Sequence, residues 1–560
     1  MSMHIHKCFS QTYNLKQGLK KFGQEGYDAT YKEIGQMHGR GGLSPVKLRD
    51  LSDEEARKAL ETVTIMLRKK NGTVKTRTCA NGSVQRNWMS KEDVASPTAA
   101  PESVMLTSLA DAIERRYVVS CDIPNAFIQA DVDVKPGDPR IVLIIRGILA
   151  EMLCKLAPDV YTPYMEEING QKVLYLIVHK AIYGMIQSPL LWYKKIRADL
   201  ESQGFKVNPY DPCVANKWVD GSYLTVLWHV DDLKISHKKE KVVDDFVNWV
   251  YKKYTDENGE VKICKGKQHL FLGILFDYSI EGMLQVNMTD YVKEMIGDFE
   301  ELYKIGDSTE CPWTERLFKV DEQSPLLEPE QAETFHTYVA KGLFLCQRAR
   351  PDIQPAIIFL CSRVKAPTEQ DWKKLLRLMK FLKGTPDVVL RLQADSFDIN
   401  WYWDASFAVH EDYVSHTGGT MTMGKGSVLS SSRKQKLNTR SSTEAELVAV
   451  DDGMSIMLWT KLFLEAQGHK VESNVLHQDN KSSILLQKNG KASSSKRTRH
   501  INIRYFFITD QIKKGNIQLK YCPTDQMIAD YFTKPLTGTQ FYCLWKLIMN
   551  PQCKGTGDSS

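Results

Sequence analysis

The chain has 560 residues, of which 42% are hydrophobic and 25% are charged, and its formal net charge is +6. This composition excludes disordered and fibrous proteins, and at ~150 residues per domain the length predicts three or four folded units. No run of eighteen apolar residues, no N-terminal signal pattern and no Cys-x-x-Cys pair occurs in the sequence, so we expect an intracellular protein without membrane spans or cysteine-based zinc sites. The small positive excess suits a polyanionic partner without establishing one.

In chain order, the sequence predicts alternating helices and strands. Residues 1–61 are expected to form a polar, helical lead-in that carries no recognisable chemistry. From residue 74 to 188, strand-like runs such as RYVVSCDI and KVLYLIV alternate with helical stretches such as ESVMLTSLADAIER. The runs NKWV and SYLTVLWHV flank Asp220–Gly221, a pair typical of a hairpin turn. A Pro-rich stretch at 312–329 precedes a helical segment, and a last α/β unit is expected from about residue 398 to 536.

Three aspartates follow apolar, strand-like runs and are candidate catalytic residues. Asp122 ends the run YVVSCD, and Asp231 and Asp232 follow SYLTVLWHV at a tight hairpin. Nucleotidyl transfer uses two Mg²⁺ ions held ~3.5–4 Å apart, and carboxylates at adjacent strand ends suit that task. The pattern alone leaves a second interpretation open, because the Asp–Asp pairs at 244–245 and 451–452 lie in helical patterns as ordinary surface charge.

Four segments occur in the order typical of one enzyme family. SCDIPNAFIQA, KAIYGMIQSPLLWY, the VDD hairpin and HLFLGILFD are similar to successive motifs in the reverse transcriptase region of copia-type LTR retrotransposon Pol polyproteins. The resemblance implies a right-hand polymerase with palm, fingers and thumb that copies RNA into DNA. It also implies that Asp122 and Asp231 bind Mg²⁺, which Mn²⁺ could replace, and that Asp232 completes the catalytic and metal-binding set.

The same resemblance assigns residues to the incoming deoxynucleotide. Phe127 matches the aromatic that lies under the sugar and excludes a 2′-hydroxyl, although without the family it reads as a core residue. Arg77, with Lys75 as a weaker companion, matches the arginine that binds the triphosphate, a role suited to a bidentate guanidinium. At His229 the family pattern is broken, because most relatives have tyrosine there. The resemblance therefore does not predict how the primer end is positioned at this residue. A histidine here is expected to give some pH sensitivity between 5 and 8.

Four acidic residues beyond the helical connection form a second candidate set. They are Asp404 on a strand, Glu446 near the start of a helix, Asp479 after a strand and Asp530 on a last helix. Attack of water on an RNA phosphodiester also uses two metal ions, so four carboxylates that bind Mg²⁺ would suit hydrolysis. Structural alternatives remain: Glu446 could form a capping box with Thr443, although Ser441 and Glu444 offer the same box, and Asp479 could cap the next helix.

The order of the strands and helices that contain these four residues resembles that of the RNase H fold. The endings STEAEL and ADYFTKPL, and the preceding segments RARPDIQPAIIFLCSRV and LKGT, resemble the copia-type pattern. The loop YCPTDQ lacks the histidine that cellular RNases H carry before the last aspartate, so product release is expected to differ. A basic run beside this site is predicted to follow nucleic-acid phosphates. It comprises Lys481, Lys488, Lys491, Lys496, Arg497, Arg499, His500 and Arg504.

We therefore predict an α+β and α/β multidomain enzyme, a reverse transcriptase followed by a connection and an RNase H-like domain. Its expected partners are an RNA template, a DNA primer, the RNA–DNA hybrid, dNTPs and other products of a longer polyprotein. Its expected location is cytoplasmic virus-like particles with a nuclear phase. The alternative is a decayed or domesticated remnant that binds nucleic acid without catalysis. The predicted boundaries are 1–61 for the lead-in, 62–305 for fingers, palm and thumb, 306–394 for the connection, 395–536 for the RNase H-like domain and 537–560 for a C-terminal tail.

Overall fold

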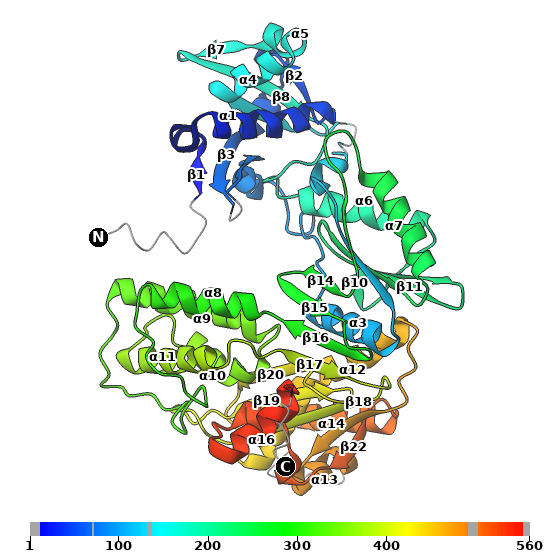
Figure 1. Cartoon of the computed structure of the whole chain (residues 1–560), viewed down its shortest axis with the longest axis vertical. Coiled ribbons are helices and arrows are strands. Elements are labelled where there is room, and N and C mark those ends of the chain that lie inside the picture. Colours follow the sequence, from blue (N-terminus) through cyan, green and yellow to red (C-terminus); the bar gives the residue numbers. More distant parts are fainter. Residues whose placement is uncertain (1–11, 70–71, 133, 135–136, 491–501, 553–560) are drawn as a thin grey trace, which may run out of the picture.

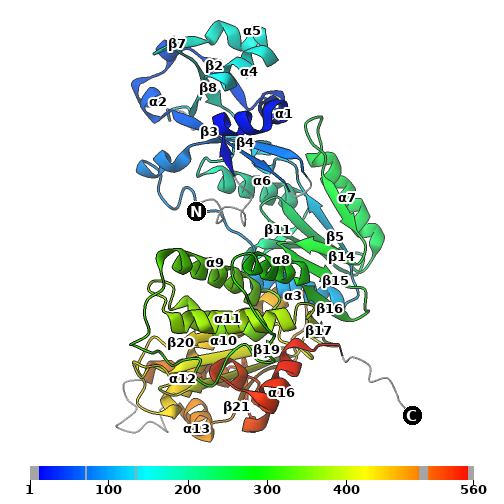
Figure 2. The same cartoon turned by 60° about the vertical axis from the view of Figure 1, so that its left-hand side comes forward.

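The computed structural model describes residues 12–69, 72–132, 134, 137–490 and 502–552. In this part of the chain the fold is built on four β-sheets with helices packed against them, which confirms the predicted mixed α/β multidomain class. The first sheet lies at one end of the molecule, and the helices α8 to α11 and the last sheet form the opposite end (Figures 1 and 2). No helix of the described residues combines the length and the hydrophobicity needed to span a bilayer.

The first sheet joins segments that are far apart in the sequence. Its strand order is β1-β3-β6-β8-β2, with β4 paired to β3 and β7 paired to β8. Helix α1 begins after Asn14, whose side chain accepts a hydrogen bond from Gln17 N–H, and contacts β3 and β4. Residues 12–61 therefore share a sheet with the strands that follow them. The elements are β1 (Tyr13–Asn14), α1 (Leu15–Gly39), β2 (Leu43–Val46), α2 (Asp53–Lys58), β3 (Leu60–Arg68), β4 (Val74–Ala80), β6 (Val142–Arg146), α4 (Ile148–Leu156), α5 (Pro158–Tyr161), β7 (Glu166–Ile168) and β8 (Gln171–Val178).

The second sheet is antiparallel throughout, with the order β13-β5-β12-β11-β10-β9. The predicted hairpin at Asp220–Gly221 is confirmed, since Val219 pairs with Ser222 across the turn. A continuous hydrophobic core runs from this sheet to the C-terminal unit. The elements are α3 (Pro101–Ile113), β5 (Tyr117–Asp122), α6 (Ser188–Ser202), β9 (Lys206–Asn208), β10 (Asp211–Val219), β11 (Ser222–His229), β12 (Asp232–His237), α7 (Glu240–Tyr254) and β13 (Lys262–Lys265).

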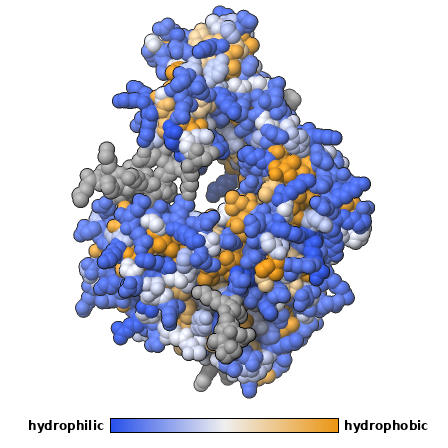
Figure 3. Space-filling model, viewed as in Figure 1, coloured by the Kyte–Doolittle hydropathy of each residue, from blue (hydrophilic) through white to orange (hydrophobic). Residues whose placement is uncertain are grey.

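A third sheet connects the two halves of the chain. Its order is β14-β15-β16-β17, and β17 joins it only after four intervening α-helices. Helix α11 begins with a capping box between Thr368 and Asp371, which satisfies free N–H groups of its first turn. On the face in Figure 3 the surface is hollowed between the first sheet and helices α8 and α9. The elements are β14 (Gln268–Phe271), β15 (Ile274–Asp277), β16 (Met283–Asn287), α8 (Thr289–Glu300), α9 (Pro329–Cys346), α10 (Gln354–Cys361), α11 (Glu369–Gly384) and β17 (Leu390–Gln393).

The C-terminal sheet has the order β20-β19-β18-β21-β22. Strands β18, β19 and β20 are antiparallel, whereas β21 and β22 run parallel to β18. Helix α12 packs on β18 and β19. The elements are β18 (Ile399–Ser406), β19 (His416–Thr422), β20 (Leu429–Lys434), α12 (Ser442–Ala466), β21 (Asn474–Gln478), α13 (Lys481–Asn489), α14 (Asn502–Lys513), β22 (Gln518–Tyr521), α15 (Asp530–Thr533) and α16 (Gly538–Met549).

Helix α16 differs from the prediction that a C-terminal tail begins at residue 537. Its apolar face, which includes Phe541, Leu544 and Trp545, is buried in the hydrophobic core. Apolar residues three and four positions apart lie on one face of a helix, so this burial stabilises the helix. Residues 538–549 are thus an integral part of the C-terminal unit.

Candidate active sites

The first candidate site lies where two neighbouring strands of the second sheet meet. Asp122 is the last residue of β5, and it pairs with Asp232, the first residue of β12. Asp231 lies in the turn between β11 and β12, and its carbonyl accepts a hydrogen bond from Ile123 N–H at 2.9 Å. The structure thus brings together the three aspartates that the sequence singled out.

The turn that carries Asp231 is held by a residue outside the hairpin. Val230 has a left-handed backbone conformation with φ of 58°, which is unusual for a β-branched residue. The buried indole of Trp192, on α6, donates a hydrogen bond of 2.6 Å to the Val230 carbonyl. Trp192 belongs to the segment KAIYGMIQSPLLWY, so this segment supports the turn beside the carboxylates.

Burial raises the pKa of two carboxyl groups in this site. The pKa of Asp231 is raised by burial and, to a smaller extent, by the Asp122 charge. Burial, with the charges of Asp231 and Asp122, raises the pKa of Asp232 to about 6. The ammonium of Lys262, on β13, lies 3.0 Å from Asp122 Oδ2. A divalent cation that takes oxygen ligands would offset the repulsion between these carboxylates, so the group is suited to bind one.

The residues predicted to bind the nucleotide are connected by an aromatic side chain that the sequence did not single out. The guanidinium of Arg77, on β4, lies 4.7 Å from the centre of the Tyr183 ring. The Tyr183 and Phe127 rings are 4.8 Å apart, centre to centre. The turn after Tyr183 needs glycine, because Gly184 has φ of 91° and a Cβ there would lie 2.0 Å from the Ala80 carbonyl oxygen.

Burial shifts the pKa of several ionisable groups near Arg77 and Asp231. Glu33, on α1, lies near Lys75 and Arg77, and burial raises its pKa although both cations act in the opposite direction. Burial also lowers the pKa of Lys75. The pKa of His229 is lowered by burial from its ordinary value of 6.5, so the imidazole is neutral near pH 7 and its titration moves toward acid pH.

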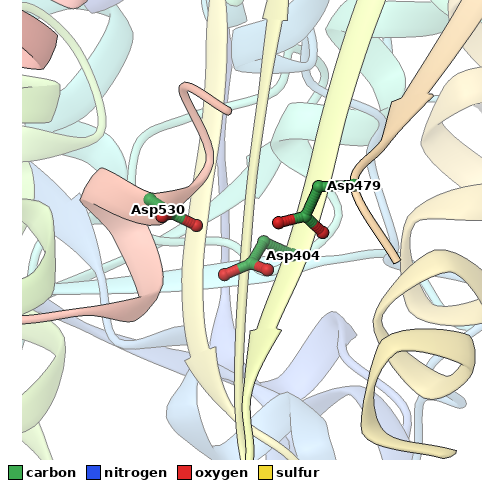
Figure 4. A group of neighbouring side chains, drawn as sticks. All are labelled: Asp404, Asp479 and Asp530. Atoms are coloured by element: carbon green, nitrogen blue, oxygen red, sulfur yellow. The ribbon is translucent and has the colours of Figure 1, made fainter. Parts of the chain in front are cut away.

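The second candidate site is formed by three aspartates that point toward one another (Figure 4). Asp404 lies on β18, Asp479 directly follows β21, and Asp530 begins α15. One carboxylate oxygen of each residue lies within 4.8 Å of the others. In the described part of the chain, these are the three acidic side chains that meet this spacing, whereas the three aspartates of the second sheet do not.

The structural alternatives for two of these acidic residues do not hold. Ser441 caps α12 by accepting a hydrogen bond from Glu444 N–H, which leaves Glu446 free of capping. The helix after Asp479 is capped by Asn480 instead. Neither acidic side chain therefore serves as a helix cap.

Glu446, the fourth predicted acidic residue, contacts this group through Asp404. Its carboxyl group is buried, shares a hydrogen bond with Asp404 and accepts a second one of 3.1 Å from Gln478. Burial, together with the Asp404 charge, raises the pKa of Glu446 well above its usual range. The structure thus brings Glu446 to Asp404, although it does not belong to the group of three.

The turn that carries Asp530 adds two further polar residues, Thr533 and Lys534, to the site. Thr533 Oγ1 donates a hydrogen bond of 2.5 Å to Asp404 Oδ2. The Lys534 ammonium lies 2.6 Å from Asp530 Oδ1 and 3.6 Å from Asp404 Oδ2. Burial and the charge of Asp404 raise the pKa of Asp530 to about 7 and also raise the pKa of Asp479. One ammonium among several buried carboxyl groups leaves the set anionic, so these oxygen donors fit Mg²⁺ or Mn²⁺.

Some residues of the sites were missed by sequence reasoning. Lys534 follows Asp530 by four residues, a spacing that brings helical side chains together and was readable in the sequence. Thr524, in the loop YCPTDQ, donates a hydrogen bond of 3.1 Å to Asp479 Oδ2. Neither this contact nor the approach of Lys262 to Asp122 has a local signal, because the partners are far apart in the sequence.

The predicted basic surface is described only in part. Lys481 begins α13 next to the second site, and its ammonium lies 5.1 Å from the centre of the half-exposed Tyr521 ring. Lys488 lies in the last turn of the same helix. Residues 491–501 and the side chain of Arg504 lie outside the described residues, so the phosphate-binding role of the run stays a prediction.

Metal-free protein should lose stability as the pH rises through neutrality. The pKa of Asp530 is about 7 in the fold, against an ordinary value of 3.8. Between these values the folded chain keeps a proton that the unfolded chain has lost, so the free energy of unfolding falls as the pH rises. We expect a melting temperature roughly 2–4 °C lower at pH 8 than at pH 6 without metal. In Asp530→Asn this difference should be smaller. Equal pH dependence in both proteins would contradict the raised pKa.

Comparison with known proteins relates the chain to one group of sequences. Residues 153–309 match the family model described as reverse transcriptase (RNA-dependent DNA polymerase). The chain is 23% identical over 85% of its length to the retrovirus-related Pol polyprotein from transposon TNT 1-94 of Nicotiana tabacum. It is 26% identical over 86% and 27% identical over 83% of its length to those from transposons RE2 and RE1 of Arabidopsis thaliana. It spans 34%, 31% and 30% of these three relatives, about a third of their length.

Among solved structures, the chain is similar to the prototype foamy virus protease–reverse transcriptase. The sequence identity is 14%, the match covers 90% of this chain and 54% of the other, and the TM-score is 0.25.

Proposed function

We propose that the chain is a reverse transcriptase region of the copia type, as its similarity to copia-type Pol polyproteins suggests, and that it copies RNA into DNA and cleaves the RNA of RNA–DNA hybrids. Membership of the reverse transcriptase family implies binding of a nucleic-acid template and primer. The observation that carries the polymerase assignment is the pairing of Asp122 with Asp232 at the strand ends, beside the turn of Asp231.

For DNA synthesis, we assign Asp122, Asp231 and Asp232 as the ligands of two Mg²⁺ ions. Bound there, the ions would activate the primer 3′-hydroxyl and neutralise the leaving pyrophosphate. The guanidinium of Arg77 would bind the triphosphate, assisted by Lys75, because its planar donors match phosphate oxygens. The contact between Tyr183 and Arg77 would hold the guanidinium in place for this role.

For hybrid cleavage, we assign Asp404, Glu446, Asp479 and Asp530 as ligands of Mg²⁺ or Mn²⁺. Metal bound by these residues would activate water for attack on the RNA phosphodiester. The observation that carries this assignment is the approach of the three aspartate oxygens to within 4.8 Å. Lys534 and Thr533 would keep Asp404 and Asp530 oriented before metal binds, since each donates to one of these carboxylates.

Two assays on purified full-length chain test the proposal. Primer extension on an RNA template measures DNA synthesis, and cutting of a labelled RNA–DNA hybrid measures the second activity. Both should require Mg²⁺ and should be lost after chelation with EDTA. The remnant hypothesis predicts hybrid binding without either activity, so binding with no extension and no cleavage would favour it over the proposal.

Replacement of Phe127 by valine should weaken the choice of deoxynucleotides over ribonucleotides. The ring contacts Tyr183, and the resemblance to copia-type reverse transcriptases implies that it lies under the sugar, where it would meet a 2′-hydroxyl. Removing steric bulk from a pocket typically changes discrimination by about 10–200-fold. We expect incorporation of rNTP relative to dNTP, opposite the same template base, to rise by at least ~10-fold. Unchanged discrimination, with normal use of dNTPs, would make Phe127 a core residue only.

A further inference from the structure

The segment RARPDI contains a buried ion pair that the proposed function leaves without a role. The side chains of Arg350 and Asp352 are 1% and 0% exposed. The guanidinium donates to both oxygens of the Asp352 carboxylate at 2.9 Å. It also donates to the carbonyl and hydroxyl oxygens of Thr385, again at 2.9 Å. Because every contact is directional and water is excluded, this pair has one well-defined geometry.

Two buried residues of the C-terminal unit form hydrogen bonds with Asp352. The Tyr531 hydroxyl donates to the Asp352 carbonyl, and the Trp545 indole donates to the Asp352 carboxylate, each at 2.9 Å. Trp313, which also precedes the C-terminal unit, donates to the Leu536 carbonyl at 2.7 Å. Its ring centre lies 5.3 Å from that of Tyr531. The segment from Tyr531 to Leu536 is therefore attached at both ends to residues outside the C-terminal unit.

This segment carries groups of the second candidate site. Asp530 directly precedes Tyr531, and Thr533 and Lys534 contact Asp404. Helix α15 is one turn long, and a single turn is not stable by its own hydrogen bonds. The position of its carboxylate must therefore come from tertiary contacts. The hydrogen bonds to Asp352 and from Trp313 supply such contacts next to the aspartate.

We propose that Arg350 and Asp352 are positioning residues for hybrid cleavage. The ion pair fixes the chain at Asp352, whose backbone carbonyl accepts the hydrogen bond from Tyr531. Through the backbone, this contact holds the neighbouring Asp530 carboxylate at its distance from Asp404 and Asp479. The inference rests on the function proposed for this site. Removing a hydrogen-bond partner of a metal ligand typically lowers metal affinity about 10–100-fold. Since Tyr531 acts through the chain and not directly on a ligand, we expect a smaller change.

Tyr531→Phe and Trp545→Phe in the full-length chain test the proposal. Each variant removes one hydrogen bond to Asp352 and keeps an aromatic ring, whereas removing Arg350 or Asp352 itself would leave a buried charge unpaired and endanger folding. For Tyr531→Phe we expect the Mg²⁺ concentration for half-maximal hybrid cleavage to rise about 3–10-fold, with a smaller rise for Trp545→Phe. Primer extension should stay at the parental rate in both.

Hydrogen–deuterium exchange of the metal-free chain gives a second measurement that does not depend on activity. We expect faster exchange at residues 526–536 in both variants, and unchanged exchange in β5 and β12. Tyr542→Phe is the matched control, because Tyr542 lies on α16 but is 52% exposed. This control should leave the Mg²⁺ midpoint and the exchange at 526–536 unchanged.

The outcomes separate this inference from the proposed function. Parental Mg²⁺ dependence and parental exchange in both variants would overturn the positioning role. A lower melting temperature with an unchanged Mg²⁺ midpoint would also overturn it, because the contacts would then be structural only. If the parent chain does not cut the hybrid at all, the proposed hydrolytic function fails and the positioning role for cleavage falls with it. The exchange data would then show whether Asp352 still anchors the segment.

Discussion

Asp231→Asn should abolish DNA synthesis and leave hybrid cleavage at the parental rate. The amide keeps the size of the side chain but removes the negative charge that a divalent cation needs from its ligand. Loss of about 4 kcal/mol of charge stabilisation corresponds to a ~10³-fold lower rate, so extension should fall by at least that factor. Primer extension and hybrid cutting by the same protein sample measure both activities.

Asp245→Asn provides a matched control for this substitution. Asp245 belongs to another Asp–Asp pair, but it is exposed on α7. Its replacement should therefore change neither activity. Near-normal extension by Asp231→Asn would refute the assignment of Asp231 as a metal ligand. Loss of both activities would indicate a damaged fold, which a melting curve would reveal.

Asp404→Asn should stop hybrid cleavage while primer extension continues. Asp404 interacts with all the other acidic groups of the site. Its charge raises the pKa of Glu446, Asp479 and Asp530. Removing that charge takes away a ligand common to the whole set, and we expect cleavage to fall at least ~10³-fold. The two sites use different residues on different sheets, so their mutational effects should be nearly independent.

Asp395→Asn is the matched control in the same part of the chain. Asp395 is exposed between β17 and β18 and takes no part in the acidic cluster. Both activities should stay unchanged in this variant. Cleavage by Asp404→Asn at the parental rate would show that the cluster is not the hydrolytic site, and the assignment of the other three acidic residues would fail with it.

Some features that we did not predict nevertheless have a local signal in the sequence. Phe541, Leu544, Trp545 and Ile548, in the predicted tail, recur at the spacing of an amphipathic helix. The spacing of Asp530 and Lys534 was likewise readable. The pairing of β1 with β3 and of β2 with β8, which joins residues 12–61 to the first sheet, had no such signal.

By itself, the sequence determined the features that depend on neighbouring residues. Runs of apolar, strand-forming residues predicted the strands that carry Asp122 and Asp404, and the turn pair at Asp220–Gly221 predicted a hairpin that the structure contains. The order of the motifs indicated a resemblance to one family, and the aspartate and glutamate residues were predicted as metal ligands because of their carboxylates. Each of these signals extends over a few residues, which is the range in which backbone periodicity and turn geometry act.

Only the tertiary structure decided which side chains meet. It brought Asp404, Asp479 and Asp530 within 4.8 Å of one another, placed Tyr183 between Arg77 and Phe127, and joined Asp352 to Tyr531 across 179 positions of sequence. Such contacts depend on how sheets and helices pack around a shared core, and packing is a property of the whole fold. No short segment of the chain contains both partners, so no local pattern could have revealed them.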